Sequence, residues 1–153
     1  NNPPSFFKTA HVGDYPMQMI LASQGYAYYI DENMAAYRSG VKGSWTDRMT
    51  NSVNVRENVI KVNEGIIQVL EGFNVYTKSK NIKEIEQVKL KLEFEVLVLK
   101  RKGKEQKSSR FSRYSSLDKL KVKAKVHIRC HYPKYFMKLA NFKDVKMKKI
   151  LRT

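Results

Sequence analysis

Asp14 is the first residue of the chain whose type and position could support chemistry. It follows Gly13 and stands before the apolar segment YPMQMILASQ, which we expect to continue a helix that begins at Asp14. One positioned carboxylate can accept a proton as a general base, which accelerates a reaction by about 10²–10⁴-fold. Asp is also a preferred helix N-cap, and before an apolar helix it usually has only that role. The two roles are compatible, because one oxygen can cap the helix while the other faces a cleft.

The segments after Asp14 would have to position its side chain. The helix is expected to end at Gly25, which suits the left-handed conformation of a helix stop. Residues 26–30, YAYYI, are aromatic and β-branched and are predicted to form a strand. A loop with two glycines, SGVKGSW at 39–45, comes after it. A helix, a strand and a loop in this order are typical of an α/β layer, so residues 1–50 are predicted to be the trailing part of one.

From Asn51 onward the hydrophobic residues recur at spacings of three and four, as on one face of a helix. The first stripe contains Val55, Val59, Val62, Ile66, Val69 and Phe73, and the second contains Ile85, Val88, Leu92, Val96 and Leu99. Residues 74–81, NVYTKSKN, separate the two stripes. Residues 96–99 would suit a strand by local propensity, but the flanking Glu and Lys residues have helical spacing. We therefore predict a helical hairpin over residues 51–101.

The last third of the chain differs from the rest in charge. Residues 1–99 carry equal numbers of basic and acidic side chains, whereas residues 100–153 carry 19 basic against 3 acidic ones and so hold the whole net charge of +16. Residues 102–116 are rich in Ser, Lys and Arg and are predicted to be a mobile linker. Residues 117–153 are predicted to be a basic amphipathic helical tail, divided by Pro133 into two short helices.

The sequence also indicates the cellular compartment of the protein. No stretch approaches the roughly 18 apolar residues that a membrane span needs, so any membrane contact is expected to be peripheral. The N-terminus lacks the basic-then-apolar pattern of a signal peptide. Cys130 is the single cysteine, which fits a reducing compartment and predicts a cytoplasmic protein. Because the sequence does not begin with Met, we expect it to be a piece of a longer protein.

Residues 3–49 carry an ordered set of motifs: Gly-Asp-Tyr, an apolar helix, a segment ending in Ile-Asp-Glu, then Tyr-Arg and a Gly-x-Trp loop. This segment resembles the second half of the catalytic domain of bacterial family 2 glycosyltransferases, inverting GT-A enzymes that build capsular and lipopolysaccharide sugars. The likeness covers about a third of the chain. It implies a mainly α chain with a short β element, namely the trailing part of a GT-A α/β catalytic domain followed by a helical hairpin and a basic helical tail.

The resemblance implies that Asp14 is the catalytic base. It would take the proton from an acceptor hydroxyl as that oxygen attacks the anomeric carbon of a nucleotide-sugar donor, in cell-surface polysaccharide synthesis. Tyr15, Arg38 and Trp45 are implied to bind substrate. Each also has a structural alternative, because Tyr15 and Trp45 could pack in the core and Arg38 could pair with a preceding acidic residue.

A divalent metal ion, Mg²⁺ or Mn²⁺, is implied for the full-length enzyme. Gly40 stands where many members of the family have a metal-ligating His, and the chain contains no Asp-x-Asp. We therefore predict no metal site here and no assignable cofactor-binding residue. The ligands should lie mainly in residues that precede this chain, which by itself should be inactive.

The expected partners are a nucleotide-sugar donor, a saccharide or lipid-linked acceptor, and an anionic membrane surface at the inner face of the cell membrane. The basic tail would dock there, with an apolar edge of Phe136, Met137, Leu139 and Phe142. Without the nucleotide-binding half, apolar surface on residues 17–30 is expected to cause self-association.

Two alternatives to the enzyme remain open. The first is a helical module for membrane docking or oligomerisation, without catalysis. The second is a nucleic-acid-binding module, because the basic tail is interleaved with aromatic residues that could stack on bases. It is disfavoured because the excess charge is confined to the tail and no nucleic-acid-binding signature is present.

Overall fold

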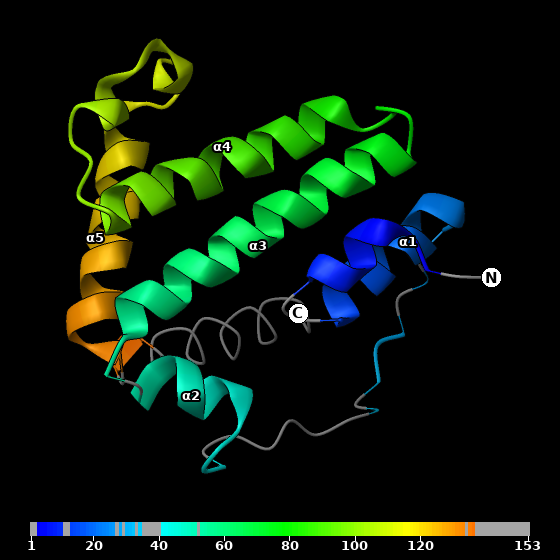
Figure 1. Cartoon of the computed structure of the whole chain (residues 1–153), viewed down its shortest axis with the longest axis horizontal. Coiled ribbons are helices and arrows are strands. Elements are labelled where there is room, and N and C mark those ends of the chain that lie inside the picture. The colour runs from blue at the N-terminus through cyan, green and yellow to red at the C-terminus, as the bar shows by residue number, and fades with distance from the viewer. Residues whose placement is uncertain are drawn as a thin grey trace.

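The computed structural model describes residues 3–10, 13–26, 28, 30–32, 34, 41–51, 53–133 and 135–136. The described elements are, in chain order, η1 (Ser5–Thr9), α1 (Asp14–Gln24), α2 (Trp45–Asn51), α3 (Val55–Tyr76), α4 (Ile82–Leu99), η2 (Glu105–Lys107), η3 (Ser109–Phe111) and α5 (Ser116–His131), where η denotes a 3-10 helix. Figure 1 shows α3 and α4 side by side as an antiparallel hairpin, with α5 crossing one end and α1 lying near the other end of α3.

The hairpin agrees with the helical periodicity of the sequence, and both of its helices are confirmed. Its apolar stripes contribute to two separate clusters. The α5-side core contains Val55, Val59, Phe94, Leu99, Phe111, Val122 and Val126. The α1-side core contains Phe6, Val69, Leu70, Phe73 and Ile85. Each cluster therefore joins the hairpin to a different part of the chain.

The end of α4 is fixed by backbone hydrogen bonds rather than by glycine. The N–H of Lys102 donates to the C=O of Leu97 at 2.9 Å, and the N–H of Arg101 donates to Val98 at 3.1 Å. This is a Schellman motif, in which the residue with positive φ is usually Gly. Here Arg101 takes that place with a φ of 58°, and Lys78, after α3, has a φ of 51°. The usual sequence signal for these helix ends is therefore missing.

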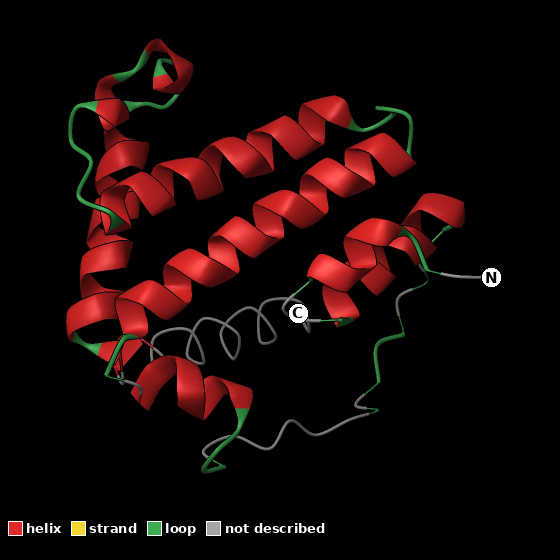
Figure 2. Ribbon diagram, in the orientation of Figure 1, coloured by secondary structure: helices red, strands yellow, loops and turns green. Residues whose placement is uncertain are grey.

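The predicted short strand over residues 26–30 is wrong for residues 26, 28 and 30, which are the ones that the structure describes. Tyr26, Tyr28 and Ile30 lie outside any regular element, and the two tyrosines are 108% and 90% exposed. A strand needs a neighbouring strand to satisfy its N–H and C=O groups. No strand occurs among the described residues, and Figure 2 accordingly contains helices and loops only.

Residues 102–116 connect α4 to α5 as predicted, but they do not form a mobile linker. Phe111 is buried against Phe94, with ring centroids 5.3 Å apart in an edge-to-face arrangement. Arg110 is held by two hydrogen bonds to Glu93. The polar composition predicted disorder, but the buried Phe111 ring and the bidentate Arg110–Glu93 ion pair hold this segment against α4.

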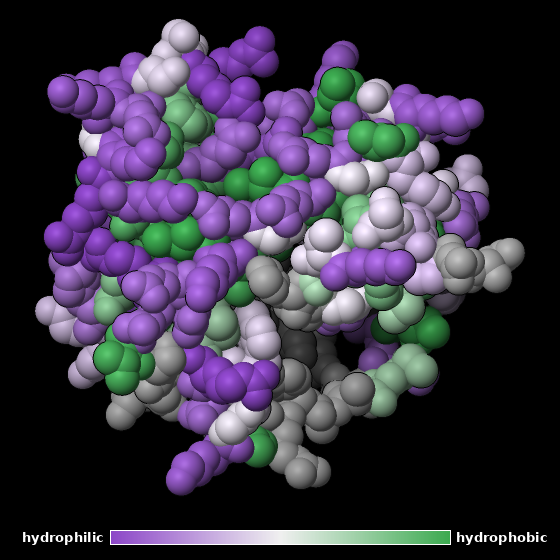
Figure 3. All heavy atoms as spheres, in the orientation of Figure 1, coloured by the Kyte–Doolittle hydropathy of each residue, from purple (hydrophilic) through white to green (hydrophobic). Residues whose placement is uncertain are grey.

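The basic helix after this segment is confirmed as α5, and Ser115 caps it by accepting a hydrogen bond from the N–H of Asp118 at 3.1 Å. The second predicted helix of the tail lies largely outside the described residues. Hydrophilic residues dominate the face in Figure 3, and hydrophobic residues are visible in smaller areas between them. No helix in the described part of the chain is both long and apolar enough to span a membrane.

Candidate functional site

Asp14 occupies the first turn of α1, but it does not cap the helix. The cap position is Gly13, and no side chain accepts a capping hydrogen bond there. The Asp14 side chain is exposed and has no hydrogen bond or ion pair to another described residue. The predicted capping role is therefore wrong. The carboxylate is accessible, and it still benefits from the positive end of the helix dipole.

Tyr15 is half-buried and packs against the α1-side core together with Met19 and Ile20. Burial raises the pKa of its phenol group, because a low-dielectric environment disfavours the charged form. This contact favours the packing interpretation of Tyr15. Its direct neighbour Pro16 is buried, and proline is tolerated in the first turn of a helix.

Trp45 is the first residue of α2 and is 45% exposed. The start of α2 is held by Ser44 and Asp47: Ser44 Oγ accepts from the N–H of Asp47 at 3.1 Å, and Asp47 accepts from the N–H of Gly43 at 2.8 Å. Met49 attaches α2 to the α5-side core. Trp45 is thus held in place by a capped helix rather than by a flexible loop.

The predicted substrate-binding residues do not form one site in the described structure. Tyr15 packs on the α1-side core, whereas α2, which carries Trp45, packs on the α5-side core. In Figure 1 the two helices lie at different ends of α3. Arg38 lies outside the described residues. The predictions for these three residues therefore stay predictions.

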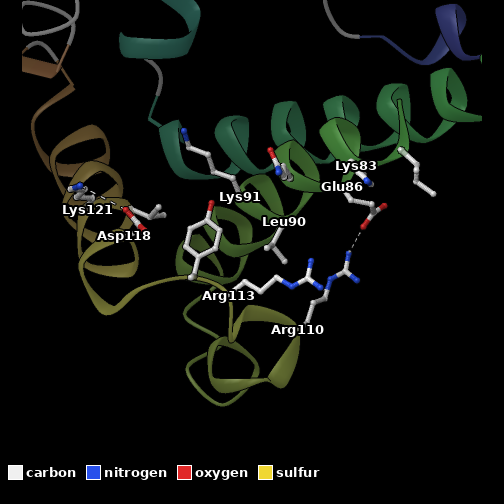
Figure 4. Close-up of a pocket in the computed structure, with 12 residues that line it drawn as sticks. Lys83, Glu86, Leu90, Lys91, Arg110, Arg113, Asp118 and Lys121 are labelled. Atoms are coloured by element: carbon white, nitrogen blue, oxygen red, sulfur yellow. Dashed lines mark ion pairs between the residues drawn. The ribbon is translucent and has the colours of Figure 1, made fainter. Parts of the chain in front are cut away.

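A hollow with a volume of about 930 Å³ lies elsewhere, between α4, the 102–116 segment and α5 (Figure 4). We call it the cationic groove. Its basic side chains are Lys83, Lys91, Arg110, Arg113 and Lys121. Two acidic side chains, Glu86 and Asp118, also line it. Sequence reasoning did not identify this groove, because it is built partly from the segment that was predicted to be mobile.

Two of the five basic side chains of the groove are paired with acids. Arg110 donates to Glu93 through Nε at 2.6 Å and through a terminal nitrogen at 2.9 Å, and it lies 3.6 Å from Glu86. The hydrogen bond to Glu93 raises the pKa of Arg110, partial burial opposes the shift, and the charges of Glu93 and Glu86 add to it. Lys121 lies 3.7 Å from Asp118.

The other three basic side chains, Lys83, Lys91 and Arg113, have no acidic partner within the described part of the chain. Tyr114 also lines the groove, and its ring stacks on Phe94 with centroids 5.8 Å apart. Burial raises the pKa of Tyr114, and the charges of Asp118 and Glu95 raise it further. Its hydroxyl therefore stays protonated at neutral pH and can donate a hydrogen bond.

One carboxylate is buried between α4 and α5. Glu95 is 2% exposed, and its Oε2 accepts from Lys125 Nζ at 2.9 Å. Its Oε1 lies 3.6 Å from Arg129. The residue sits within the largely apolar run LEFEVLVL, which also contains Glu93. Glu95 therefore joins α4 to α5 through its two basic partners.

No group of three or more His, Cys, Asp or Glu side chains that could hold a metal ion is found among the described residues. The divalent ion implied by the resemblance therefore has no set of ligands in this part of the chain. No protein-family model matches the sequence, and comparisons with curated proteins and with solved structures give no significant match.

Proposed function

We propose that this chain is the C-terminal part of an inverting glycosyltransferase of the GT-A type, in which Asp14 is the catalytic base. The exposed Asp14 carboxylate is the observation that supports this proposal, because no capping bond or ion pair occupies it. The motif set around it, from Gly-Asp-Tyr to Gly-x-Trp, supplies the resemblance.

In the proposed reaction, Asp14 accepts the proton of an acceptor hydroxyl as the hydroxyl oxygen forms a bond to the anomeric carbon of a nucleotide-sugar donor. The bond from that carbon to the nucleoside diphosphate breaks on the opposite face, so the configuration inverts. An alcohol is a poor nucleophile at neutral pH, which is why a positioned base is needed. The metal ion and the donor site belong, in this proposal, to the remainder of a longer enzyme.

Replacing Asp14 with Asn in the full-length enzyme tests the assignment. The amide preserves size but cannot accept the proton, so we expect turnover to fall by about 10²–10⁴-fold while donor binding is retained. Glu57→Gln is the matched control, because Glu57 is also an exposed carboxylate in the first turn of a helix. A folded Asp14→Asn enzyme with near-normal turnover would show that Asp14 is not the base.

We also propose that the enzyme is peripheral at the cytoplasmic face of the cell membrane, with α5 as the docking helix. Leu117 and Leu120 are 59% and 62% exposed, and their spacing puts them on one side of the helix. Lysines 119, 121 and 123 flank them. Of the apolar edge predicted for the tail, Phe136 lies beneath the guanidinium of Arg129 at 5.6 Å, and Met137, Leu139 and Phe142 lie outside the described residues.

A further inference from the structure

The cationic groove brings basic side chains from three separate elements to one hollow. Lys83 and Lys91 come from α4, Arg110 and Arg113 from the 102–116 segment, and Lys121 from α5. Five basic against two acidic side chains give the lining a net charge of +3. Like charges around one hollow repel each other, and a bound anion would relieve that repulsion.

Two basic side chains of the groove form ion pairs with acidic residues, and the other three remain available to bind an anion. Glu93 and Glu86 engage Arg110, and Asp118 lies near Lys121. Arg113, Lys83 and Lys91 are left without an acid among the described residues. In Figure 4 the Arg113 side chain runs toward the guanidinium of Arg110, and Arg110 points toward Glu86. An Arg fork matches two oxygens of a phosphate, and a Lys adds a point charge.

The floor of the groove is apolar. Leu90, Val122 and the ring of Tyr114 line it, and Tyr114 is fixed by its stacking on Phe94. The volume of about 930 Å³ falls within the range of about 300–1,000 Å³ that is typical of small-molecule sites. A single inorganic phosphate would not fill this space, whereas a phosphate attached to a ring or to an apolar group would contact both the cations and the floor.

From this geometry we infer that the cationic groove binds a phosphate ester, with Arg113 and Lys83 as its main contacts to the phosphate, because both lie at the same end of the groove in Figure 4. The inference does not depend on the proposed transferase activity, because none of the residues around Asp14 lines the groove. A phosphomonoester carries a charge of about −1.5 to −2 at pH 7, which the three cations without acidic partners could balance.

A second basic cavity, between the 102–116 segment and α5, provides the matched control. It is lined by Lys104, Lys107, Lys119 and Lys123, together with Gly103 and Gln106, and has neither an Arg nor an apolar floor. Lys104→Gln/Lys107→Gln removes the same charge as Arg113→Gln/Lys83→Gln and leaves the lysines of α5 unchanged. All four side chains are exposed, so neither double variant should disturb the core.

The test titrates the whole chain with inorganic diphosphate by calorimetry at about 0.15 M salt, where the Debye length of roughly 8 Å limits long-range attraction. We expect Arg113→Gln/Lys83→Gln to weaken binding by at least about tenfold, because hydrogen bonds to charged groups are lost. The control should change it by less than about twofold. Thermal unfolding of both variants checks that the fold is intact.

A second arm identifies the source of the phosphate. Vesicles of phosphatidylcholine with phosphatidic acid are sedimented with the chain, with and without competing diphosphate. Vesicle binding that requires Arg113 and Lys83 and is displaced by diphosphate assigns the site to a lipid headgroup. Diphosphate binding without such vesicle binding assigns it to a soluble phosphate ester. The inference is overturned if neither probe binds, or if both double variants reduce binding equally.

Discussion

At the scale of a single residue, Glu95 attaches α5 to α4 through two ion pairs. It is the buried acidic side chain of the described structure, and its partners Lys125 and Arg129 both come from α5. A buried carboxylate is costly unless basic groups and hydrogen bonds compensate for its lost hydration. Glu95 therefore specifies which face of α5 meets α4, while Val122 and Val126 supply the apolar contact.

We expect Glu95→Gln to lower the free energy of unfolding by about 1–3 kcal/mol, because two charged partners lose their counter-charge at a buried site. Glu64→Gln is the control: Glu64 pairs with Lys100 at 2.6 Å, but both side chains are about two-fifths exposed. Exposed pairs contribute roughly 0–1 kcal/mol. Urea unfolding followed by circular dichroism measures both variants, and equal losses would argue against a special role for Glu95.

At the scale of elements, the attachment of η1 to α3 depends on Gly72, because a glycine has no side chain and lets Phe6 approach closely. The ring of Phe6 lies 6.1 Å from that of Phe73, edge to face, and Phe6 is buried in the α1-side core. A Cβ atom added to Gly72 would overlap the Cβ of Phe6. The close approach of η1 thus explains why a glycine stands in the middle of α3. Because α1 follows η1 in the chain, this contact also helps to position α1.

Gly72→Ala should therefore act against its usual direction. In an exposed helix this change stabilises by about 1 kcal/mol. Here the clash is with a Cβ, which no rotation of the Phe6 side chain can move, so we expect destabilisation of about 1–3 kcal/mol, as for overpacking. Gln68→Ala, at an exposed position of α3, should be nearly neutral. A higher melting temperature for Gly72→Ala than for the unmodified chain would contradict the packing of η1.

Considered as a whole molecule, the chain carries all its excess charge at one end of the sequence. Residues 1–99 balance, and residues 100–153 hold the net +16. In the fold, part of that charge faces inward to Glu95, part lines the cationic groove, and part surrounds Leu117 and Leu120 on the exposed side of α5. Lys121 contributes to both the second and the third use.

Docking of α5 on a membrane is the prediction that belongs to this scale. Each Lys or Arg near an anionic surface contributes about 1 kcal/mol, and insertion of Leu117 and Leu120 adds apolar burial. We expect Leu117→Ser/Leu120→Ser to lose most of the binding to vesicles that contain phosphatidylglycerol. The control Val53→Ser/Val75→Ser changes two other exposed apolar residues and should bind normally. Binding that is insensitive to lipid charge or to both leucines would refute docking through α5.

The predicted self-association also belongs to the whole chain and stays a prediction. Met17 and Leu21 of α1 are exposed, and their spacing of four places them on one side of the helix. This exposure is what the sequence-based hypothesis requires, because residues 17–30 were expected to be covered by a missing half.

The sequence by itself determined α1, the two helices of the hairpin and α5, but not α2, whose first residue was assigned to a loop. The spacing of Val59, Val69 and Leu99 in the hairpin, and of Val122 and Val126 in α5, places apolar groups on one side of a helix with 3.6 residues per turn, and burial of that side is the dominant favourable contribution to folding. It also identified Asp14 as an accessible carboxylate candidate at the start of α1, since helix starts are marked by local residue type.

Only the tertiary structure decided three features: the absence of a strand in the described part of residues 26–30, the packing of residues 102–116, and the cationic groove. The strand over residues 26–30 was predicted from local propensity, which cannot tell whether a neighbouring strand exists. Arg110, Phe111 and Arg113 looked like part of a mobile linker because composition is blind to one buried ring and one bidentate ion pair. The cationic groove takes its residues from α4, the 102–116 segment and α5, and no single helix face contains them all. Such a site exists only once long-range packing has brought its side chains together, so no local pattern could predict it.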